Sequence, residues 1–224
     1  MGQYRDRVVN VLFHGVGTPR RSLEPDEERY WVDTARFHRL LDELADRPDV
    51  RISFDDGNVS DTDIALPALE QRELRAAFFV IAGRLGARGS LGEDDVRELH
   101  RRGMQIGSHG MSHRPWPGLD PASRRAELVE ARASLAAVCG APVDSAACPL
   151  GRYDRRVLAD LRRLGYVRVF TSDRRPVRSD AWLQARYSIR ADETPASLRA
   201  EVLSRPGPGA RARLAAFGLV KRLR

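Results

Sequence analysis

Cysteine, lysine and long apolar runs are all scarce in this sequence of 224 residues. The two cysteines, Cys139 and Cys148, are too few for a disulfide framework, so we expect two reduced thiols, with a single bridge as the alternative. No stretch reaches the roughly 18 apolar residues of a membrane-spanning helix. Residues 1–7 lack the apolar core of a signal peptide, and a cytoplasmic location is therefore predicted.

The rest of the composition is that of an ordinary soluble domain. Hydrophobic residues make up 42% of the chain and charged residues 31%, which is typical of globular proteins. The length suits one domain with its own core and a short tail. Because positions 205–209 read Arg-Pro-Gly-Pro-Gly, we predict a domain over residues 1–204, then a linker and a separate tail over residues 205–224.

The net charge of +7 lies almost entirely near the C-terminus. From Thr194 onward seven basic residues accompany one acidic residue, which leaves +1 for residues 1–193. A body so close to neutral predicts no nucleic-acid partner, and a nucleic-acid-binding protein is an alternative that rests on the tail alone. Apolar residues at 214, 217, 220 and 223 favour a basic amphipathic helix, which could lie on the inner face of a membrane or against the domain.

Short apolar runs alternate with helical patterns along the chain. This alternation predicts an α/β protein with a parallel sheet or barrel, whose functional residues follow the carboxyl ends of the strands. The predicted strands cover residues 8–13, 50–54, 75–81, 104–107, 145–148, 166–171 and 185–189, and the predicted helices cover residues 34–46, 61–73, 92–102, 121–139, 154–164 and 194–203.

Two short motifs follow predicted strands and carry residues that bind metals. Asp55 and Asp56 come directly after the strand at 50–54, and His109 and His113 follow the strand at 104–107. One carboxylate with two histidines can hold a metal and leave coordination positions open, and the second carboxylate could then act as a base. Taken singly, the carboxylates fit a surface turn and the histidines fit an ordinary loop. Their combination predicts a metal-dependent hydrolase.

In these motifs the sequence resembles the polysaccharide deacetylases, the NodB-homology group or carbohydrate esterase family 4. The resemblance runs from about residue 8 to residue 189 and implies a distorted (β/α) barrel that removes acetyl groups from sugar polymers. It implies Asp55 as the general base, and Asp56, His109 and His113 as ligands of a divalent metal, with zinc expected and cobalt or nickel as alternatives. The implied substrate is an acetylated polysaccharide or oligosaccharide, with N-acetyl expected before O-acetyl.

The family's third motif, Arg-x-Pro-Tyr, is altered in this sequence. The equivalent stretch contains Pro149, Leu150 and Gly151, so the arginine and the tyrosine are both replaced. The resemblance gives a backbone N–H at the tyrosine position the task of stabilising the oxyanion, and a backbone donor at Leu150 survives the change of side chain. Arg152 and Tyr153 are expected to begin the next helix.

Two further assignments also rest on the resemblance. Arg186, near a late predicted strand, is similar to an arginine that orients the base in other members, although a surface arginine is the alternative. The family's last motif is absent, since no histidine follows Ile189. His14 ends the first predicted strand and resembles the Tyr-His element that opens the poly-N-acetylglucosamine deacetylase branch. Because the first and last strands of a closed barrel can be neighbours, His14 is predicted to be the general acid, with a loop-capping histidine as the alternative.

Aromatic residues suggest where a sugar could bind. The long segment at 15–32 is expected to form a groove wall beside the active face. Trp31, Trp182 and Trp116 are candidate platforms for sugar rings, and each is equally compatible with a core or lid position. The altered third motif and the absent last motif leave one alternative to an enzyme: a carbohydrate-binding protein that retains the barrel without turnover.

Overall fold

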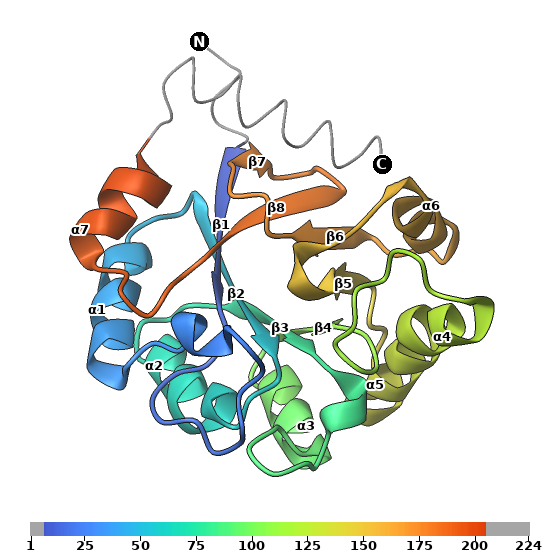
Figure 1. Cartoon of the computed structure of the whole chain (residues 1–224). Helices are drawn as coiled ribbons and strands as arrows, with labels where there is room; N and C mark the ends of the chain where they lie inside the picture. The colour runs from blue at the N-terminus through green and yellow to red at the C-terminus, as the bar shows by residue number, and fades with distance from the viewer. Residues whose placement is uncertain (1–6, 205–224) are drawn as a thin grey trace.

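Seven parallel strands close into a barrel in the computed structural model, which describes residues 7–204 (Figure 1). β1 pairs in parallel with both β2 and β8, and this double pairing joins the two ends of the sheet. The distorted (β/α) barrel predicted from the sequence is therefore confirmed, including the contact between its first and last strands. The strands of the ring are β1 (Arg7–Phe13), β2 (Val50–Asp56), β3 (Ala76–Val80), β4 (Gln105–Ser108), β5 (Ser145–Ala147), β6 (Arg168–Thr171) and β8 (Leu183–Ser188).

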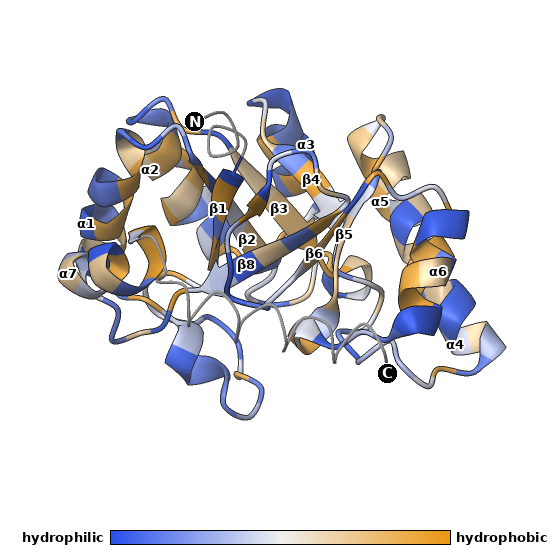
Figure 2. Ribbon diagram, turned by 90° about the horizontal axis from the view of Figure 1, so that it is seen from above, coloured by the Kyte–Doolittle hydropathy of each residue, from blue (hydrophilic) through white to orange (hydrophobic). Residues whose placement is uncertain are grey.

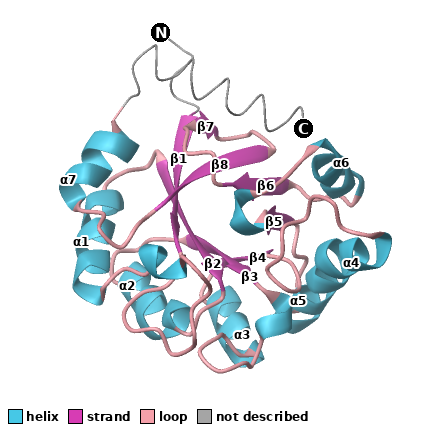
Figure 3. Ribbon diagram, in the orientation of Figure 1, coloured by secondary structure: helices cyan, strands magenta, loops and turns pink. Residues whose placement is uncertain are grey.

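Helices form an outer layer around the strands (Figure 3). Their starts follow from local capping: the Asp33 carboxylate accepts from the Arg36 N–H at the start of α1, and Asp154 does the same for Val157 in α6. π-helical turns at Asp61–Ala65, Ala126–Glu130 and Leu198–Leu203 adjoin α2, α5 and α7. The helices are α1 (Thr34–Ala45), α2 (Leu66–Glu70), α3 (Glu93–Arg101), α4 (Pro121–Arg125), α5 (Ala131–Cys139), α6 (Arg155–Arg163) and α7 (Pro195–Ser197).

The main core lies between the barrel and these helices. Phe54 on β2 stacks on Phe78 of β3 with ring centroids 4.8 Å apart, and Phe13 stacks on its other side at 5.5 Å. Phe37 of α1 meets Phe13 edge to face at 5.2 Å. Such pairs add about 0.5–1.5 kcal/mol each beyond the burial of their area. Figure 2 shows the matching pattern in α1, which is hydrophobic toward the strands and hydrophilic outside.

The interior of the barrel differs from this outer core because it holds polar side chains beside a small apolar cluster of Ala77, Phe79, Ala147 and Phe170. Side chains alternate along a strand, so β2 turns Ile52 and Phe54 toward the helices and Ser53 and Asp55 toward the barrel axis. Arg186 of β8 is fully buried in the same interior. The fold therefore aligns a row of polar groups along the axis, with its functional end where the strands finish.

Most predicted elements are present within residues 7–204, and the differences concern strand ends and short elements. β2 continues two residues beyond the predicted end, through both carboxylates. The two-residue β7 (Val177–Arg178), antiparallel to the start of β1, and a 3-10 turn at Glu27–Tyr30 were not predicted, because such short elements carry no periodicity.

Other predictions concern the cysteines, the membrane and the tail. Cys139 and Cys148 are not joined by a disulfide. No helix within residues 7–204 combines the length and the apolarity needed to cross a bilayer. The predicted linker and basic tail at 205–224 lie outside the described residues.

Candidate active site

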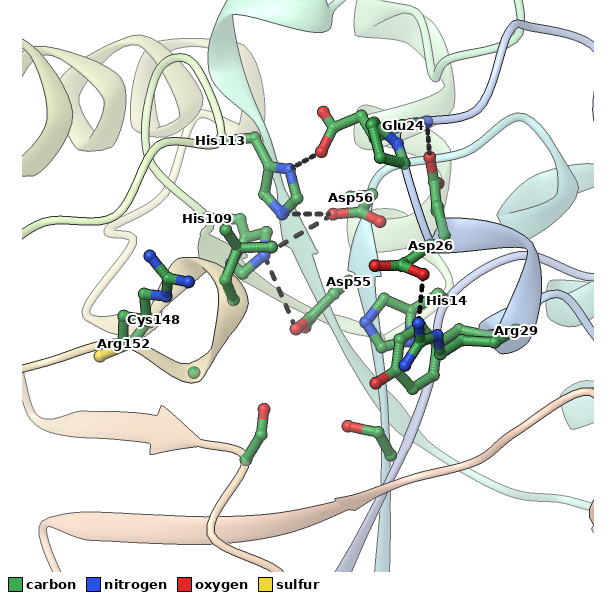
Figure 4. Close-up of a pocket in the computed structure, with 17 residues that line it drawn as sticks. His14, Glu24, Asp26, Arg29, Asp55, Asp56, His109, His113, Cys148 and Arg152 are labelled. Carbon is green, nitrogen blue, oxygen red and sulfur yellow. Dashed lines mark hydrogen bonds and ion pairs between the residues drawn. The ribbon is translucent and has the colours of Figure 1, made fainter. Parts of the chain in front are cut away.

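A cavity of about 390 Å³ lies where the strands end (Figure 4). Its floor comes from residues at the carboxyl ends of six strands and from the loops that follow, and residues 24–30 form one wall. The predicted residues that line it are His14 after β1, Asp55 and Asp56 at the end of β2, His109 and His113 after β4, and Leu150 and Gly151 after β5; Ser172 after β6 and Ser188 of β8 complete the floor.

Three of these residues form a compact cluster of metal-ligating atoms. Oδ1 of Asp56 lies 3.4 Å from Nε2 of His113 and 3.6 Å from Nε2 of His109. In a tetrahedral zinc site with bonds near 2.0–2.1 Å, neighbouring ligand atoms stand about 3.3 Å apart. Oδ1 of Asp56 is buried and has no hydrogen-bond partner among residues 7–204. An orphaned carboxylate oxygen facing two imidazole nitrogens fits a divalent cation.

The far sides of both imidazoles are held by hydrogen bonds. Nδ1 of His109 lies 2.9 Å from the Ala147 carbonyl, which can only accept, so Nδ1 carries the proton and Nε2 presents a lone pair to the cluster. Burial lowers the pKa of His109, more than the nearby Asp55 carboxylate raises it, and this also favours the neutral ring. Nδ1 of His113 lies 2.8 Å from Oε2 of Glu24, and Glu24 is also paired with Arg84. Figure 4 shows Glu24 reaching His113 from the loop wall.

Asp55 is held by a buried two-pronged ion pair. Nη1 and Nη2 of Arg186 each donate to a different carboxylate oxygen of Asp55, both at 2.7 Å. Arg186 also donates to the Ser53 hydroxyl at 3.3 Å, and its guanidinium lies 5.1 Å from the ring centroid of Phe79. Burial raises the pKa of Asp55, but the Arg186 charge and smaller contributions outweigh burial and hold that pKa below its usual range. Asp55 is therefore a fixed carboxylate.

Asp55 also reaches the cluster, because its Oδ2 lies 3.7 Å from Nε2 of His109. Regular strand geometry would turn Asp55 and Asp56 to opposite faces. The structure brings both to one cavity because Asp56 adopts a φ of 78°. His113 and Leu150 each have a φ of 55° as well. Left-handed backbone at non-glycine residues costs about 1–3 kcal/mol and gathers at functional sites.

His14 stands on the opposite side of the cavity floor from the cluster (Figure 4). Its ring lies against Tyr30, with centroids 4.9 Å apart, and its Nδ1 is buried without a hydrogen-bond partner in the described chain. Tyr30 ends the 3-10 turn of the 15–32 segment, which Val16 and Val32 close by a β-bridge. The predicted groove wall is thus present.

The altered third motif forms a tight turn at the cavity edge. Leu150 is 57% exposed, and it lines the cavity together with Gly151, whereas Pro149 is buried outside the lining. Gly151 has a φ of 61°, and a Cβ placed there would lie 2.9 Å from Cβ of Ser172. Arg152 also lines the cavity, and α6 begins only at Arg155, so the prediction that Arg152 and Tyr153 begin the helix was wrong.

The tryptophans do not line this cavity, which corrects their prediction as sugar platforms. Trp31 is 8% exposed, its ring packs on Gly15, and its Nε1 donates to Glu27 at 3.3 Å. Trp182 lies beside α6, where its Nε1 donates to the Tyr166 carbonyl at 2.7 Å. Trp116 is 1% exposed. The sequence predicted the 15–32 segment as a wall but not which of its side chains line the cavity; these include Glu24, Asp26, Arg29 and Tyr30.

The closed ring of parallel strands with surrounding helices makes the protein a (β/α) barrel. Its Asp-His-His cluster lies at the carboxyl ends of the strands, where enzymes of this architecture have their active sites. The polysaccharide deacetylase family model matches residues 43–169, more than half of the chain. The chain therefore belongs to the polysaccharide deacetylase family. The matched range includes Asp55, Asp56, His109 and His113, whereas His14 and Arg186 lie outside it.

Individual relatives agree with this membership. YxkH of Bacillus subtilis (strain 168), whose name assigns it to the same family, is 26% identical over 141 residues, which cover 63% of this chain and 50% of that protein. The chain thus spans about half the length of this relative. The Streptococcus pyogenes deacetylase PplD shares the fold with a TM-score of 0.76 at 19% identity, over 89% of this chain and 99% of that one. IcaB from Ammonifex degensii gives a TM-score of 0.70 at 22% identity, over 89% and 98% of the two chains.

Proposed function

We propose that the protein removes acetyl groups, N-acetyl before O-acetyl, from a polysaccharide or oligosaccharide. One observation supports this above all others. A buried, arginine-held carboxylate, Asp55, lies 3.7 Å from His109 of an Asp-His-His cluster, and both open into the same cavity. Hydrolysis of an acetamide needs a base, a polarised carbonyl and a proton donor for the leaving amine. Each has a candidate at this cavity.

Asp56, His109 and His113 are proposed to hold a divalent metal, zinc first, with cobalt or nickel as alternatives. When bound, such an ion supplies Lewis acidity, which lowers the pKa of a water to about 7 and polarises a carbonyl oxygen. Hydrogen bonds from Nδ1 of His109 to the Ala147 carbonyl and from Nδ1 of His113 to the Glu24 carboxylate keep the proton of each imidazole on Nδ1. The Nε2 lone pairs are thereby directed toward Asp56.

Asp55 is proposed to take the proton of the attacking water. A base must be ionised at the working pH, and the fork from Arg186 keeps the pKa of Asp55 low despite its burial, which has the larger single effect. The fork also fixes the plane of the carboxylate, so Arg186 acts as a positioning residue. The neighbouring carboxylate, Asp56, has no such partner and remains available to the cluster.

His14 is proposed to donate the proton to the leaving amine, and with it we propose that the protein belongs to the branch of the family that uses an N-terminal strand histidine. Its position after β1, against Tyr30, puts an imidazole across the floor from His109. The backbone N–H of Leu150, in a left-handed turn at the cavity edge, is the proposed oxyanion donor. Tyr30 replaces the tryptophans as the aromatic surface offered to a sugar ring.

A screen of acetylated chito-oligomers with zinc, cobalt and nickel, scored by acetate release, tests this function. We expect release that depends on metal and disappears in His113→Ala together with bound metal. His100→Ala, an exposed histidine in α3, is the matched control and should retain both. If the wild type binds zinc and saccharide but releases no acetate from any substrate, the protein is a carbohydrate-binding relative without turnover.

A further inference from the structure

A second cavity, of about 220 Å³, opens at the amino ends of the strands, at the opposite end of the barrel from the candidate active site. Arg51 near the start of β2, Arg75 just before β3 and Arg168 at the start of β6 all line it. Asn10 and Ser53 also line it. Three arginines from three different parts of the chain thus line one opening, which we call the amino-end cavity.

The positive charge of this cavity is not neutralised within residues 7–204. No acidic residue lines it, and none of its three arginines forms an ion pair in that range. Arg51 donates instead to the Ser179 carbonyl at 3.1 Å, and Arg75 makes only a long contact of 3.4 Å with the Leu74 carbonyl. Backbone carbonyls carry no net charge, so these bonds orient the guanidinium groups without cancelling them.

Two of the three arginines, Arg51 and Arg168, are also close enough to repel each other. The pKa of Arg51 is lowered, first by partial burial and second by the charge of Arg168. Keeping two like charges together in a partly buried place costs free energy that a bound anion would recover. A purely structural role would be served better by an apolar residue, such as the buried Val8 near the start of β1.

Sheet register explains why the cavity is polar on its inner side. Asn10 is the register partner of both Arg51 on β2 and Arg186 on β8, so these positions share one level of the barrel. Asn10 is 1% exposed; its Nδ2 donates to Gln184 at 3.0 Å, while its Oδ1 has no hydrogen-bond donor among the described residues. A ligand that brings both negative charge and a hydroxyl would satisfy the arginines and this acceptor together.

We propose that the amino-end cavity binds a phosphate group, either as free phosphate or as the phosphate of a small ester. Guanidinium forks match phosphate oxygens, and three of them can each take a different oxygen of the tetrahedron. A monoprotonated phosphate also keeps one hydroxyl that can donate to Asn10. Acetate, the product of the proposed deacetylation, has two oxygens and no donor. The cavity holds roughly seven times the volume of a liquid water molecule, near 30 Å³, so a small organic group fits beside the phosphate.

The test measures binding to the full chain after chelation of metals, so that it is independent of the proposed deacetylase function and of the Asp-His-His cluster. Inorganic phosphate, glucose 6-phosphate and sodium acetate are titrated by calorimetry at constant ionic strength set with sodium chloride. We expect phosphate to bind and acetate to bind at least tenfold more weakly. Binding of glucose 6-phosphate as tight as that of phosphate would assign an ester as the ligand, whereas weaker binding would assign free phosphate.

Arginine variants locate the binding. Arg51→Ala and Arg168→Ala should each weaken phosphate binding by roughly tenfold or more, the value of one charge-assisted contact. Arg75→Ala, which removes the most exposed of the three, keeps the test available if a more buried replacement fails to fold. Arg88→Ala, an exposed arginine elsewhere, and Arg152→Ala, in the active-site cavity, should leave the affinity unchanged. Phosphate binding no tighter than that of acetate, or undiminished in all three cavity variants, would overturn the proposal.

Discussion

Replacing Arg186 with methionine should destabilise the protein and reverse the pH dependence that Asp55 contributes. The side chains of Arg186 and Asp55 are 0% and 3% exposed, and two bonds of 2.7 Å join them. Removing one partner of a buried ion pair leaves the other charge uncompensated, which costs about 3–5 kcal/mol. Methionine fills similar space, so the loss reflects charge more than volume. Arg199→Met, which removes a half-exposed pair with Glu43, should change stability by less than about 1 kcal/mol.

The pH dependence follows from the sign of the Asp55 shift. In the wild type the folded-state pKa of Asp55 lies below its ordinary value of 3.8, because Arg186 outweighs the larger single effect of burial. Its contribution to stability is therefore present above pH 3.8 and is lost as the pH falls through the folded-state value. Without Arg186, burial alone raises that pKa, and stability falls as the pH rises above 3.8. The gap between Arg186→Met and the wild type should widen from pH 4 to pH 7.

Urea unfolding of the metal-free protein at these two pH values measures the gap, and a double-mutant cycle isolates the pair. Asp55→Asn alone strands the Arg186 charge, whereas Asp55→Asn with Arg186→Met removes both charges and should recover much of the loss. Single losses that add to within about 0.5 kcal/mol in the double variant, or a gap that is the same at pH 4 and pH 7, would refute a stabilising ion pair between Asp55 and Arg186.

Three further predictions concern single positions. Burial first, and the Asp56 charge second, raise the pKa of the fully buried Asp61 well above 3.8. The stability of Asp61→Asn relative to the wild type should therefore rise by about 1.4 kcal/mol for each pH unit above 3.8, until the pH reaches the folded-state pKa of Asp61. A pH-independent difference in urea unfolding would contradict this. Glu24→Ala should weaken zinc affinity roughly 10–100-fold in chelator competition, because His113 loses its hydrogen-bond acceptor; an unchanged affinity would deny Glu24 that role. Gly151→Ala should lower stability by about 1–3 kcal/mol, since a Cβ would meet Ser172 at 2.9 Å in a left-handed turn, and thermal unfolding equal to the wild type would show that the turn relaxes freely.

The parallel strands could be predicted because most of them are short runs of apolar residues that lie between helical patterns in the sequence. The alternation alone fits an open parallel sheet as well as a barrel, and closure was expected from the resemblance to the polysaccharide deacetylases; the structure confirms it by pairing β1 with both β2 and β8. The position of the two motifs followed from the same logic, because parallel strands bring their carboxyl ends to one side. Asp55, Asp56, His109 and His113 therefore meet in one cavity, although two strands and two helical segments separate them in sequence.

What the sequence could not show were contacts made by the 15–32 segment. Glu24 is one of several acidic residues in a stretch without periodicity, and tertiary contacts such as the Val16–Val32 bridge and the pairing with Arg84 bring it to His113. The positions of the tryptophans could not be predicted because a large aromatic ring suits a core as well as a groove. The Trp31 ring packs directly on the backbone of Gly15, which has no side chain.

The loop position of Arg152 could have been predicted from Asp154, where the predicted helix over residues 154–164 begins. Asp154 is a typical N-cap residue, and the structure shows its carboxylate accepting from Val157 N–H. A helix capped at Asp154 excludes Arg152 and leaves it in the preceding loop, where it lines the cavity. The left-handed backbone of Asp56 left no such trace, because its cause is the tertiary arrangement that turns two successive carboxylates to one side.

The central claim is that Asp55 acts as the base and Asp56 as a metal ligand. Zinc stoichiometry and acetate release, measured on Asp55→Asn and Asp56→Asn, test it most directly. Both changes are isosteric and remove one charge, and Asp94→Asn, at a fully exposed side chain, is the matched control. We predict that Asp55→Asn retains one zinc ion per chain and releases no acetate, whereas Asp56→Asn loses the zinc. Equal loss of zinc in both variants, or acetate release by Asp55→Asn at the rate of the control, would contradict the account.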